Sequence, residues 1–325
     1  MKVFGIDIGG TKTTLVIGSL EGSILAKRRF LSKPERSFSN YIHELQKEAS
    51  ALLEELGSSI SDIELVGIAA PGPLCVNSGQ LLHPPNLPNW KGAQIASEVK
   101  EIFSCPVVLN NDGNASCLAE YYFGDYGKSR GTESMLYLTM STGIGGGAIE
   151  KGQLIQGASD TALEIGHIVI DLDGPRCACG QRGCFEEFCG GRAVAHRVEK
   201  KLKKEKISSS LNACIQAGEP LKMELIIEAV RKRDKFALSV WEEFLDRAAQ
   251  GVSILIMTLN PEVVLLGTIA MHAEDLFIQP LKKRLKSLAW PEPLKDLILE
   301  AGTLKEDLSP LSGIAVAKAS IPEKG

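Results

Sequence analysis

Apolar and polar residues in the N-terminal part of the chain alternate as expected of short strands followed by a helix. Runs rich in β-branched and apolar residues predict strands over 2–8, 13–20 and 23–30, joined by glycine-containing turns into an antiparallel start. Apolar residues at helical spacing then predict a helix over 39–56. A further apolar strand is predicted over 64–69, before a long proline-rich loop of the kind that usually has a function.

The rest of the chain continues the alternation of strands and helices. A buried strand over 106–109 precedes Asn111-Asp112 and a helix, and strands over 134–139 and 147–149 enclose a second glycine-rich turn. The second half therefore repeats the strand, glycine turn, strand opening of the first. Further helices are predicted over 193–202, 221–231, 236–258 and 309–320, with a buried strand over 263–266. The predicted fold class is α/β.

Two local patterns within these helices have simple structural interpretations. Ser309-Pro310 is typical of an N-cap followed by the first helical residue, so it is expected to open the last helix. The lysines between Lys200 and Lys206 are interspersed with other residue types, which is typical of a solvated helix face. We assign this basic cluster no function.

Composition narrows the class of protein. The chain has 325 residues, 44% of them hydrophobic and 23% charged, which indicates a folded protein of about two domains. Its net charge of −4 gives no electrostatic reason to expect nucleic acid or an anionic membrane as a partner. Asp7 interrupts the first apolar stretch, and no apolar run is long enough for a spanning helix, so a cytoplasmic protein is expected.

One segment concentrates unusual residues. Twelve of the 32 glycines lie between Gly143 and Gly191, together with four of the eight cysteines. His167, Cys177, Cys179 and Cys184 form the pattern H-x9-C-x-C-x4-C, the nitrogen and sulfur ligand set of a structural zinc site. The alternative is a group of free core thiols beside an unrelated histidine. The other cysteines are scattered, so a disulfide framework is not expected.

Two glycine turns have residues suited to binding phosphate. The segment from Asp7 to Lys12 places an acid, Gly9-Gly10, the Thr11 hydroxyl and a lysine on one hairpin. Glycine lets backbone N–H groups approach phosphate oxygens, and the acid can hold a hydrated Mg²⁺ ion. The alternative is a turn with no ligand. Because Ser141 to Gly147 provides a second such turn in a repeated context, we expect a nucleoside triphosphate.

The pair Asn111-Asp112 allows two interpretations. An aspartate between a buried strand and a helix is commonly an N-cap. A carboxylate at a strand end can also take a proton from an attacking hydroxyl. The residues themselves leave both open.

The motifs together resemble the ROK family of sugar kinases and sugar-responsive repressors. The resemblance rests on Asp7 to Lys12, Asn111-Asp112, Glu164-Ile165-Gly166-His167 and the segment from Cys177 to Glu186, and it spans residues 2 to about 320. It implies two ribonuclease-H-like lobes of the actin and hexokinase-like class, with an active cleft between them and a zinc-binding loop. The small lobe would comprise 1–117 with 307–325, and the large lobe 118–306.

The resemblance also assigns roles to residues. Asp112 would be the general base that activates a sugar hydroxyl for attack on the γ-phosphate of ATP. The sugar would be bound by Asn86, Asn111, Asp112, Glu164, His167 and Glu186. The nucleotide would lie against Asp7, Gly9, Gly10, Thr11, Lys12, Thr142, Gly143 and Gly267, with Asp7 near Mg²⁺. Structural Zn²⁺ would be held by His167, Cys177, Cys179 and Cys184.

The expected activity is phosphorylation of a hexose, with glucose as the first choice, to give glucose 6-phosphate. This choice rests on the chain length, the long helical insertion after Cys189 and the Pro-Asn-Leu-Pro-Asn-Trp loop, which most resemble those of bacterial glucokinases within the family. Repressors of the family have a helix-turn-helix domain ahead of the core, whereas here Met1-Lys2-Val3 runs directly into the first strand. The alternatives are a kinase for N-acetylmannosamine, fructose or another hexose, and a sugar sensor without catalysis. Family members are often homodimers or homotetramers.

Several positions depart from the family pattern. Ser141 stands in the second phosphate turn where glycine is usual, and Ala162-Leu163 replaces a common Ala-Gly. Thr268 and Ile269 stand where two further glycines are common, beyond the strand that ends at Gly267. The last departure affects the expected affinity for the nucleotide and the choice among nucleotides.

Overall fold

The computed structural model describes residues 1–322 and divides into two compact units. The first unit contains residues 1–137, 146–163 and 303–322, and the second contains 138–145 and 164–302. Each unit is a set of residues whose backbones lie close together. The two lobes expected from the sequence stay a prediction, with the small lobe at 1–117 and 307–325 and the large lobe at 118–306. Within residues 1–322, no helix combines the length and the apolar character that crossing a membrane would require.

A mixed five-stranded sheet forms the centre of the first unit, in the order β3-β2-β1-β4-β7. Its strands are β1 (Lys2–Ile8), β2 (Lys12–Ser19), β3 (Ile24–Leu31), β4 (Leu65–Ala70) and β7 (Val107–Asn111). β1, β2 and β3 are antiparallel, as expected, whereas β1, β4 and β7 run parallel. In the register, Asp7 lies opposite Ala69, and Ala69 lies opposite Asn110. The carboxyl ends of the three parallel strands therefore form one edge.

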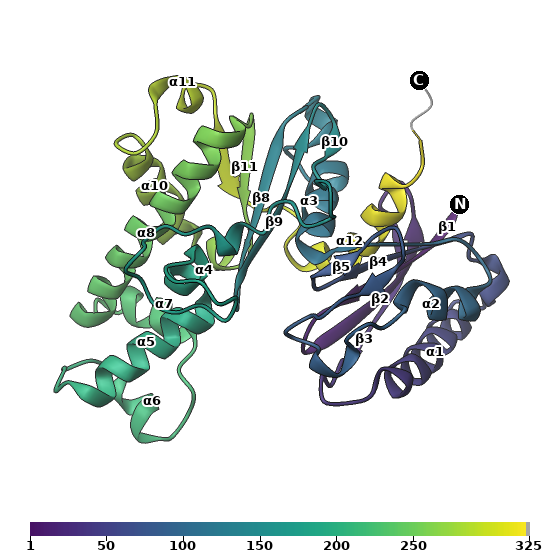
Figure 1. Ribbon diagram of the computed structural model, residues 1–325, viewed down its shortest axis with the longest axis horizontal. Helices are drawn as coiled ribbons and strands as arrows, with labels where there is room; N and C mark the ends of the chain where they lie inside the picture. The colour runs from purple at the N-terminus through teal and green to yellow at the C-terminus, as the bar shows by residue number, and fades with distance from the viewer. Residues whose placement is uncertain (323–325) are drawn as a thin grey trace. The chain divides into compact units, whose positions relative to one another are not determined.

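The helices of the first unit cover both faces of this sheet (Figure 1). They are α1 (Phe38–Glu55), α2 (Ile95–Phe103), α3 (Asp112–Phe123) and α12 (Leu308–Ala319). Alternate residues of β1, including Phe4 and Ile6, pack in a core with Tyr41 of α1 and Val99 of α2. The opposite face contacts α12 so closely that a Cβ on Gly313 would lie 2.6 Å from the backbone nitrogen of Ile6. Glycine is required there because no side chain fits.

The second sheet has the order β10-β9-β8-β11-β12. Its strands are β8 (Met135–Met140), β9 (Ile144–Glu150), β10 (Gln153–Leu154), β11 (Val263–Leu266) and β12 (Ile298–Ala301). The repeated strand, turn, strand pattern expected from the sequence is present in β8 and β9. The expected start of β9 at Gly147 was wrong, since the strand begins at Ile144. Backbone pairing overrides the low strand propensity of its glycines, and the turn shortens to 141–143.

Helices dominate the second unit. They are α4 (Phe185–Cys189), α5 (Gly191–Lys204), α6 (Asn212–Gln216), α7 (Met223–Arg231), α8 (Lys235–Leu259), α9 (Ile269–His272), α10 (Glu274–Leu285) and α11 (Pro291–Leu294). Trp241 and Phe244 of α8 stack with ring centroids 4.9 Å apart, and Phe277 of α10 packs beside them. Gly251 of α8 admits the ring of Phe185, where a Cβ would come within 2.5 Å. This contact fixes α4 on α8.

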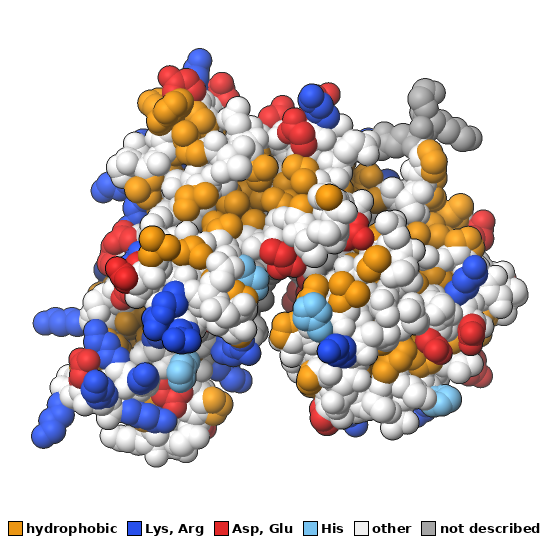
Figure 2. Space-filling view, viewed as in Figure 1, with side chains coloured by type: hydrophobic (Ala, Val, Ile, Leu, Met, Phe, Trp, Pro, Cys, Tyr) orange, Lys and Arg blue, Asp and Glu red, His pale blue; other side chains and the backbone are white. Residues whose placement is uncertain are grey.

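The lysines between 200 and 206 are exposed on and just after α5, whose buried side consists of Val194, Ala195, Val198 and Leu202. Figure 2 shows Lys and Arg side chains over this helical part of the second unit. The amphipathic pattern of α5 accounts for this arrangement.

The remaining elements are short, and some elements of the fold were not predicted from the sequence. The pair β5 (Leu74–Cys75) and β6 (Gln80–Leu81) and the 3-10 turns η1 (Ile60–Asp62), η2 (Pro88–Trp90), η3 (Lys128–Arg130), η4 (Ile165–His167) and η5 (Lys305–Asp307) complete the chain. Neither α2 nor α10 was predicted from the sequence. Proline interrupts the helical pattern of α10 at position 280, although α10 continues through it.

The expected start of the last helix was wrong. Ser309 is not the N-cap, because α12 begins at Leu308 directly after η5, with Asp307 in the cap position. The side chain of Ser309 instead forms hydrogen bonds to Asp7 and Thr14. Pro310 is still within the first turn, where its missing N–H is tolerated.

Candidate active site

The first glycine turn joins β1 to β2 and is held by Ser32, the residue that follows β3. The N–H of Gly9 donates to the carbonyl of Lys12 at 2.9 Å, which closes the hairpin. Ser32 reinforces it, since its hydroxyl donates to the Gly9 carbonyl at 2.7 Å and its N–H donates to the Thr11 carbonyl at 2.9 Å. Thr11 and Lys12 are exposed at the tip. The turn is therefore rigid and presents a hydroxyl and an ammonium group to solvent.

Asn86 lies against this turn. A Cβ on Gly10 would come within 3.2 Å of the Asn86 Cβ, so a side chain there would require Asn86 to move slightly away. The following loop is anchored because the indole N–H of Trp90 donates to the carbonyl of Arg36 at 3.1 Å. Within the first unit, the structure thus brings together a predicted sugar contact and a predicted phosphate contact.

Asp7 lies at the end of β1, half-buried and facing α12. The Ser309 hydroxyl bonds to its Oδ2 atom, and a further hydrogen bond of 2.9 Å links Ser309 to Thr14. Removal of water raises the pKa of Asp7 to about 6, while the hydrogen bond from Ser309 and the charge of Arg29 act in the opposite direction. The pairing of Ser309 with Asp7 was not predicted from the sequence, since no local pattern relates residues so far apart.

Asn111 and Asp112 have different structural roles. Asn111, not Asp112, is the N-cap of α3, because its Oδ1 atom accepts from the N–H groups of Gly113 at 2.8 Å and Asn114 at 3.4 Å. Asp112 is exposed in the first turn, and its Oδ1 atom accepts a hydrogen bond of 2.9 Å from Gly113. The capping interpretation of the pair therefore applies to the asparagine, and α3 has its cap without Asp112.

The second glycine turn is held by α4 and α5. The carbonyl of Ser141 accepts from the N–H of Gly191 at 2.8 Å, and that of Thr142 accepts from Arg192 at 3.1 Å. Glu186 fixes the other side, where its Oε2 atom accepts from the Ile144 N–H at 2.8 Å. A Cβ on Gly143 would lie 2.2 Å from the same oxygen. Gly143 is thus needed for Glu186 to reach the turn.

The four predicted metal ligands come together in the second unit. Their donor atoms all lie within 4.8 Å of one another. The Nδ1 atom of His167 is 3.6 Å from the Cys177 Sγ atom, and the Sγ atoms of Cys179 and Cys184 are also 3.6 Å apart. Bond lengths of about 2.0–2.3 Å to a tetrahedral zinc would separate its ligands by roughly this distance. One imidazole and three thiols therefore fit a zinc ion in chemistry and in spacing.

The loop bearing these ligands is attached to α8. The guanidinium of Arg247 donates to Asp171 at 2.9 Å, and the Gln250 amide donates to the Ile170 carbonyl at 2.7 Å. Arg247 also lies over the ring of Phe188, 4.5 Å from its centroid. A rigid helix therefore positions the loop.

The charges of His167 and Glu186 both act on the carboxyl group of Glu164. Removal of water raises the pKa of Glu164, although the residue keeps contact with solvent; the charge of Glu186 raises it further and His167 lowers it. Two acids and an imidazole therefore lie near one another beside the metal ligands. Such a group offers donors and acceptors of the kind that sugar hydroxyls require.

Comparison with known proteins gives a match to the ROK family over residues 3–317. The chain belongs to the ROK family. It is 31% identical to a glucokinase from Thermotoga maritima over 323 residues, which cover 99% of this chain and 98% of that protein. It is 27% identical to a xylose repressor from Caldicellulosiruptor bescii, covering 97% of this chain and 77% of the repressor.

A solved ROK family glucokinase from Streptomyces griseus, in complex with glucose and AMPPNP, superimposes with a TM-score of 0.79 at 26% identity, covering 98% of each chain. The predicted family is thus confirmed, as is an α/β fold with mixed sheets of the actin and hexokinase-like class. The two-lobe arrangement and the zinc-binding loop stay predictions.

In this ROK family chain, the end of β11 departs from the glycine-rich pattern in conformation as well as in sequence. Gly267 is buried, and its N–H donates to the Leu138 carbonyl at 2.8 Å. Thr268 follows with φ 47° and ψ −89°, a region that β-branched residues avoid. The Thr268 backbone thus keeps a conformation for which glycine would be suited.

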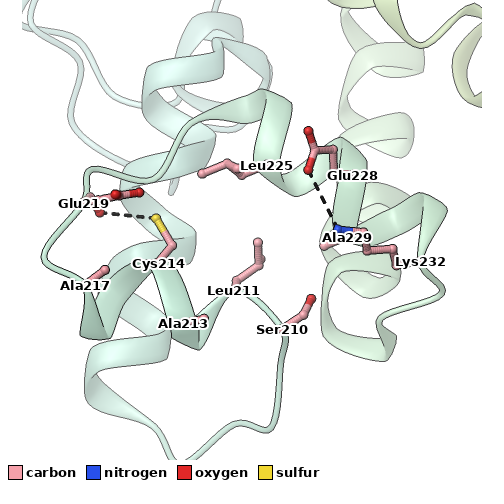
Figure 3. Close-up of a pocket in the computed structure, with 10 residues that line it drawn as sticks. All are labelled: Ser210, Leu211, Ala213, Cys214, Ala217, Glu219, Leu225, Glu228, Ala229 and Lys232. Atoms are coloured by element: carbon pink, nitrogen blue, oxygen red, sulfur yellow. Dashed lines mark hydrogen bonds and ion pairs between the residues drawn. The ribbon is translucent and has the colours of Figure 1, made fainter.

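The structure also has a cavity of about 360 Å³ between α6 and α7 (Figure 3). Leu211, Ala213 and Leu225 contribute to its apolar lining, and the Cys214 thiol donates to the Glu219 carbonyl at 3.4 Å. None of the predicted site residues lines this cavity. It is therefore separate from the residues that carry the family resemblance.

Proposed function

We propose that this ROK family protein is an ATP-dependent hexose kinase that phosphorylates glucose to glucose 6-phosphate, with Asp112 as the general base. The observation that carries the proposal is the position of Asp112, exposed at the end of β7 beside an asparagine that already caps α3. The similarity to a glucokinase over nearly the full length of both chains supports the same conclusion.

Phosphoryl transfer would require this chain mainly to position the two substrates and to neutralise the charge of the phosphates. The Asp112 carboxylate would accept the proton of the attacking sugar hydroxyl, which is worth roughly 10²- to 10⁴-fold in rate. The turns at 9–12 and 141–143 would face the phosphates, with Thr11, Lys12 and Thr142 exposed for contact. Gly267 would lie near the adenosine through its carbonyl side, because its N–H is already bonded.

Mg²⁺ fits the residues around Asp7. A carboxylate at the phosphate edge of the sheet is a suitable partner for a hydrated Mg²⁺ ion, which keeps several waters in protein sites. The Oδ2 atom of Asp7 is occupied by Ser309, which leaves Oδ1 to accept from a metal-bound water. When bound, the ion would supply neutralisation of the phosphate charge.

Zn²⁺ fits the cluster of His167, Cys177, Cys179 and Cys184 as a structural ion. With the metal on Nδ1 of His167, its Nε2 atom would carry the proton and could donate to a sugar hydroxyl. Asn86, Asn111, Glu164 and Glu186 complete the proposed sugar contacts. The role of the zinc would be to fix the orientation of the imidazole.

A panel of sugars with ATP in a coupled assay of ADP release tests the proposal. Glucose is expected to be the best acceptor. Phosphorylation of N-acetylmannosamine or fructose but not of glucose would replace the proposed substrate and leave the kinase assignment in place.

The second candidate is a sugar sensor without catalysis, which is motivated by the side chains of Thr268 and Ile269 where the family commonly has glycines. Calorimetry separates the two, since a sensor would bind sugar without binding ATP.

We also propose that the protein acts in the cytoplasm as a homodimer or homotetramer. Light scattering on the purified protein measures the second property.

A further inference from the structure

We propose that Ser309 is a positioning residue that holds the Asp7 carboxylate in place for the hydrated Mg²⁺ ion. Ser309 is the last link of a hydrogen-bonded chain that begins at Arg29 and passes through Thr14. The inference rests on the proposed kinase function and extends it to Ser309, Thr14 and Arg29, which lie outside the motifs that carry the family resemblance.

The direction of this chain follows from the number of available hydrogens. Arg29 can only donate, and its Nε atom lies 3.2 Å from the Thr14 hydroxyl. Asp7 as a carboxylate can only accept, so the hydroxyl of Ser309 donates to Oδ2. Each hydroxyl has one hydrogen, and therefore the Thr14 hydroxyl donates to Ser309 across the 2.9 Å contact between them.

The chain connects four elements of the first unit. Asp7 lies on β1, Thr14 on β2, Arg29 on β3, and Ser309 in the first turn of α12. Thr14 is 4% exposed, so water competes little with its hydrogen bonds. An exposed cation at one end and a half-buried carboxylate at the other polarise every bond in the same direction. The arrangement fixes one carboxylate oxygen, Oδ2, and leaves Oδ1 to accept from a metal-bound water.

Ser309 does not serve α12 itself. The nearby Ser312 shows the ordinary behaviour, since its hydroxyl donates to the Leu308 carbonyl of its own helix at 2.8 Å. The Ser309 hydroxyl instead turns to the sheet. Burial raises the pKa of Asp7, and the hydrogen bond from Ser309 lowers it. Loss of that bond would therefore raise the pKa of Asp7 further.

The test compares Ser309→Ala with Ser312→Ala, which removes a hydroxyl of equal size from the same helix. A hydrogen bond to a charged group changes an equilibrium by about tenfold to a hundredfold. We expect Ser309→Ala to lower kcat by about tenfold or more and to raise the Mg²⁺ concentration needed for AMPPNP binding in calorimetry. The KM for sugar should stay within about twofold of the parent, and Ser312→Ala should behave as the parent in both assays.

Two further variants protect the test against misfolding. Thr14→Val breaks the chain one link earlier at nearly constant volume, and we expect it to weaken Mg²⁺-dependent AMPPNP binding in the same direction. Ser309→Thr keeps the hydroxyl and should retain Mg²⁺-dependent binding. If Ser309→Ala is folded and its Mg²⁺ dependence equals that of Ser312→Ala, the proposal is wrong.

The outcomes also separate this inference from the proposed function. A parent protein that phosphorylates no sugar overturns the proposed function, and the role of Ser309 with it. An active parent together with an unaffected Ser309→Ala variant overturns only the role of Ser309.

Discussion

The Oε2 atom of Glu186 accepts a hydrogen bond of 2.8 Å from the backbone N–H of Ile144. This bond joins the acid that follows the metal ligands to the residue that follows the second glycine turn. Gly143 makes it possible, since any Cβ there would displace the carboxylate. In the proposed kinase, a single side chain would therefore contact the sugar and support a phosphate turn.

Truncation of Glu186 should affect both substrates. We expect Glu186→Ala to raise the KM for sugar by about tenfold or more, as a hydrogen bond to a charged group is lost. The KM for ATP should rise as well, because the turn at 141–143 loses an anchor. Steady-state kinetics with each substrate varied in turn measures both effects. Glu187→Ala is the matched control on the same helix, and an ATP KM unchanged in Glu186→Ala would contradict the coupling.

Removal of the proposed base should affect turnover and spare binding. Asp112→Asn is nearly isosteric, and α3 keeps its cap from Asn111. We expect kcat to fall by roughly 10²- to 10⁴-fold, while calorimetry shows sugar affinity within a few-fold of the parent. Asp296→Asn changes an exposed acid elsewhere and serves as the control for purification. Turnover close to that of the parent in Asp112→Asn would exclude the base role.

The purified protein should contain about one equivalent of zinc. Cys184→Ser removes a buried ligand and should lower both the zinc content and the Tm. Cys214→Ser removes a thiol outside the cluster and should change neither. Elemental analysis and thermal melting provide the two readouts. Zinc below about half an equivalent in fresh, active, unchelated parent protein would contradict the assignment.

Close packing of α12 on the first sheet should make Gly313 intolerant of a side chain. A Cβ there would meet the Ile6 nitrogen at 2.6 Å and the Gly5 Cα atom at 2.7 Å. Overpacking of this kind costs about 1–3 kcal/mol, so Gly313→Ala should lower the free energy of unfolding by that amount or more. Urea denaturation measures it, with Ser320→Ala at the end of α12 as control. A loss below about 0.5 kcal/mol would show that the helix can shift.

Glu120 should make stability depend on pH. Its carboxylate is fully buried and accepts from the Thr303 N–H and hydroxyl, both at 2.8 Å, and from the Leu304 N–H at 3.1 Å. Burial raises its pKa above the usual value despite these bonds. The native state then binds the proton more tightly than the unfolded state. This contribution to stability is complete below the usual carboxyl pKa and is lost as pH rises through the raised value.

Replacement by glutamine tests that sign. As pH rises from about 4 to 8, the free energy of unfolding of the parent should fall relative to that of Glu120→Gln. Glu98→Gln, at an exposed position of α2, should show no such trend. A difference that moves in the parent's favour with rising pH would mean that the three hydrogen bonds outweigh burial.

Local pattern was sufficient for much of the fold. The strands β1 to β4, the helices α1, α5, α7 and α8, and the repeated strand, turn, strand unit follow from periodicity and glycine placement, because short-range sterics and hydrophobic spacing act along the chain. The metal ligands His167, Cys177, Cys179 and Cys184 are close in sequence, and the structure brings them together. Their zinc ion stays a prediction.

Only the tertiary structure decided what the side chains at element ends do. Ser309 has the local pattern of an N-cap, yet its hydroxyl bonds to Asp7, which is some three hundred positions away in the chain. Asn111 takes the cap that its neighbour could have taken, and Ile144 joins a strand where the sequence favours a turn. For Ser309 and Ile144, the polar group or backbone segment could have taken a local partner but is bonded to a distant one instead. Packing of distant elements determines the partner. The free-energy cost of leaving a buried polar group unpaired exceeds the differences in free energy between local conformational propensities.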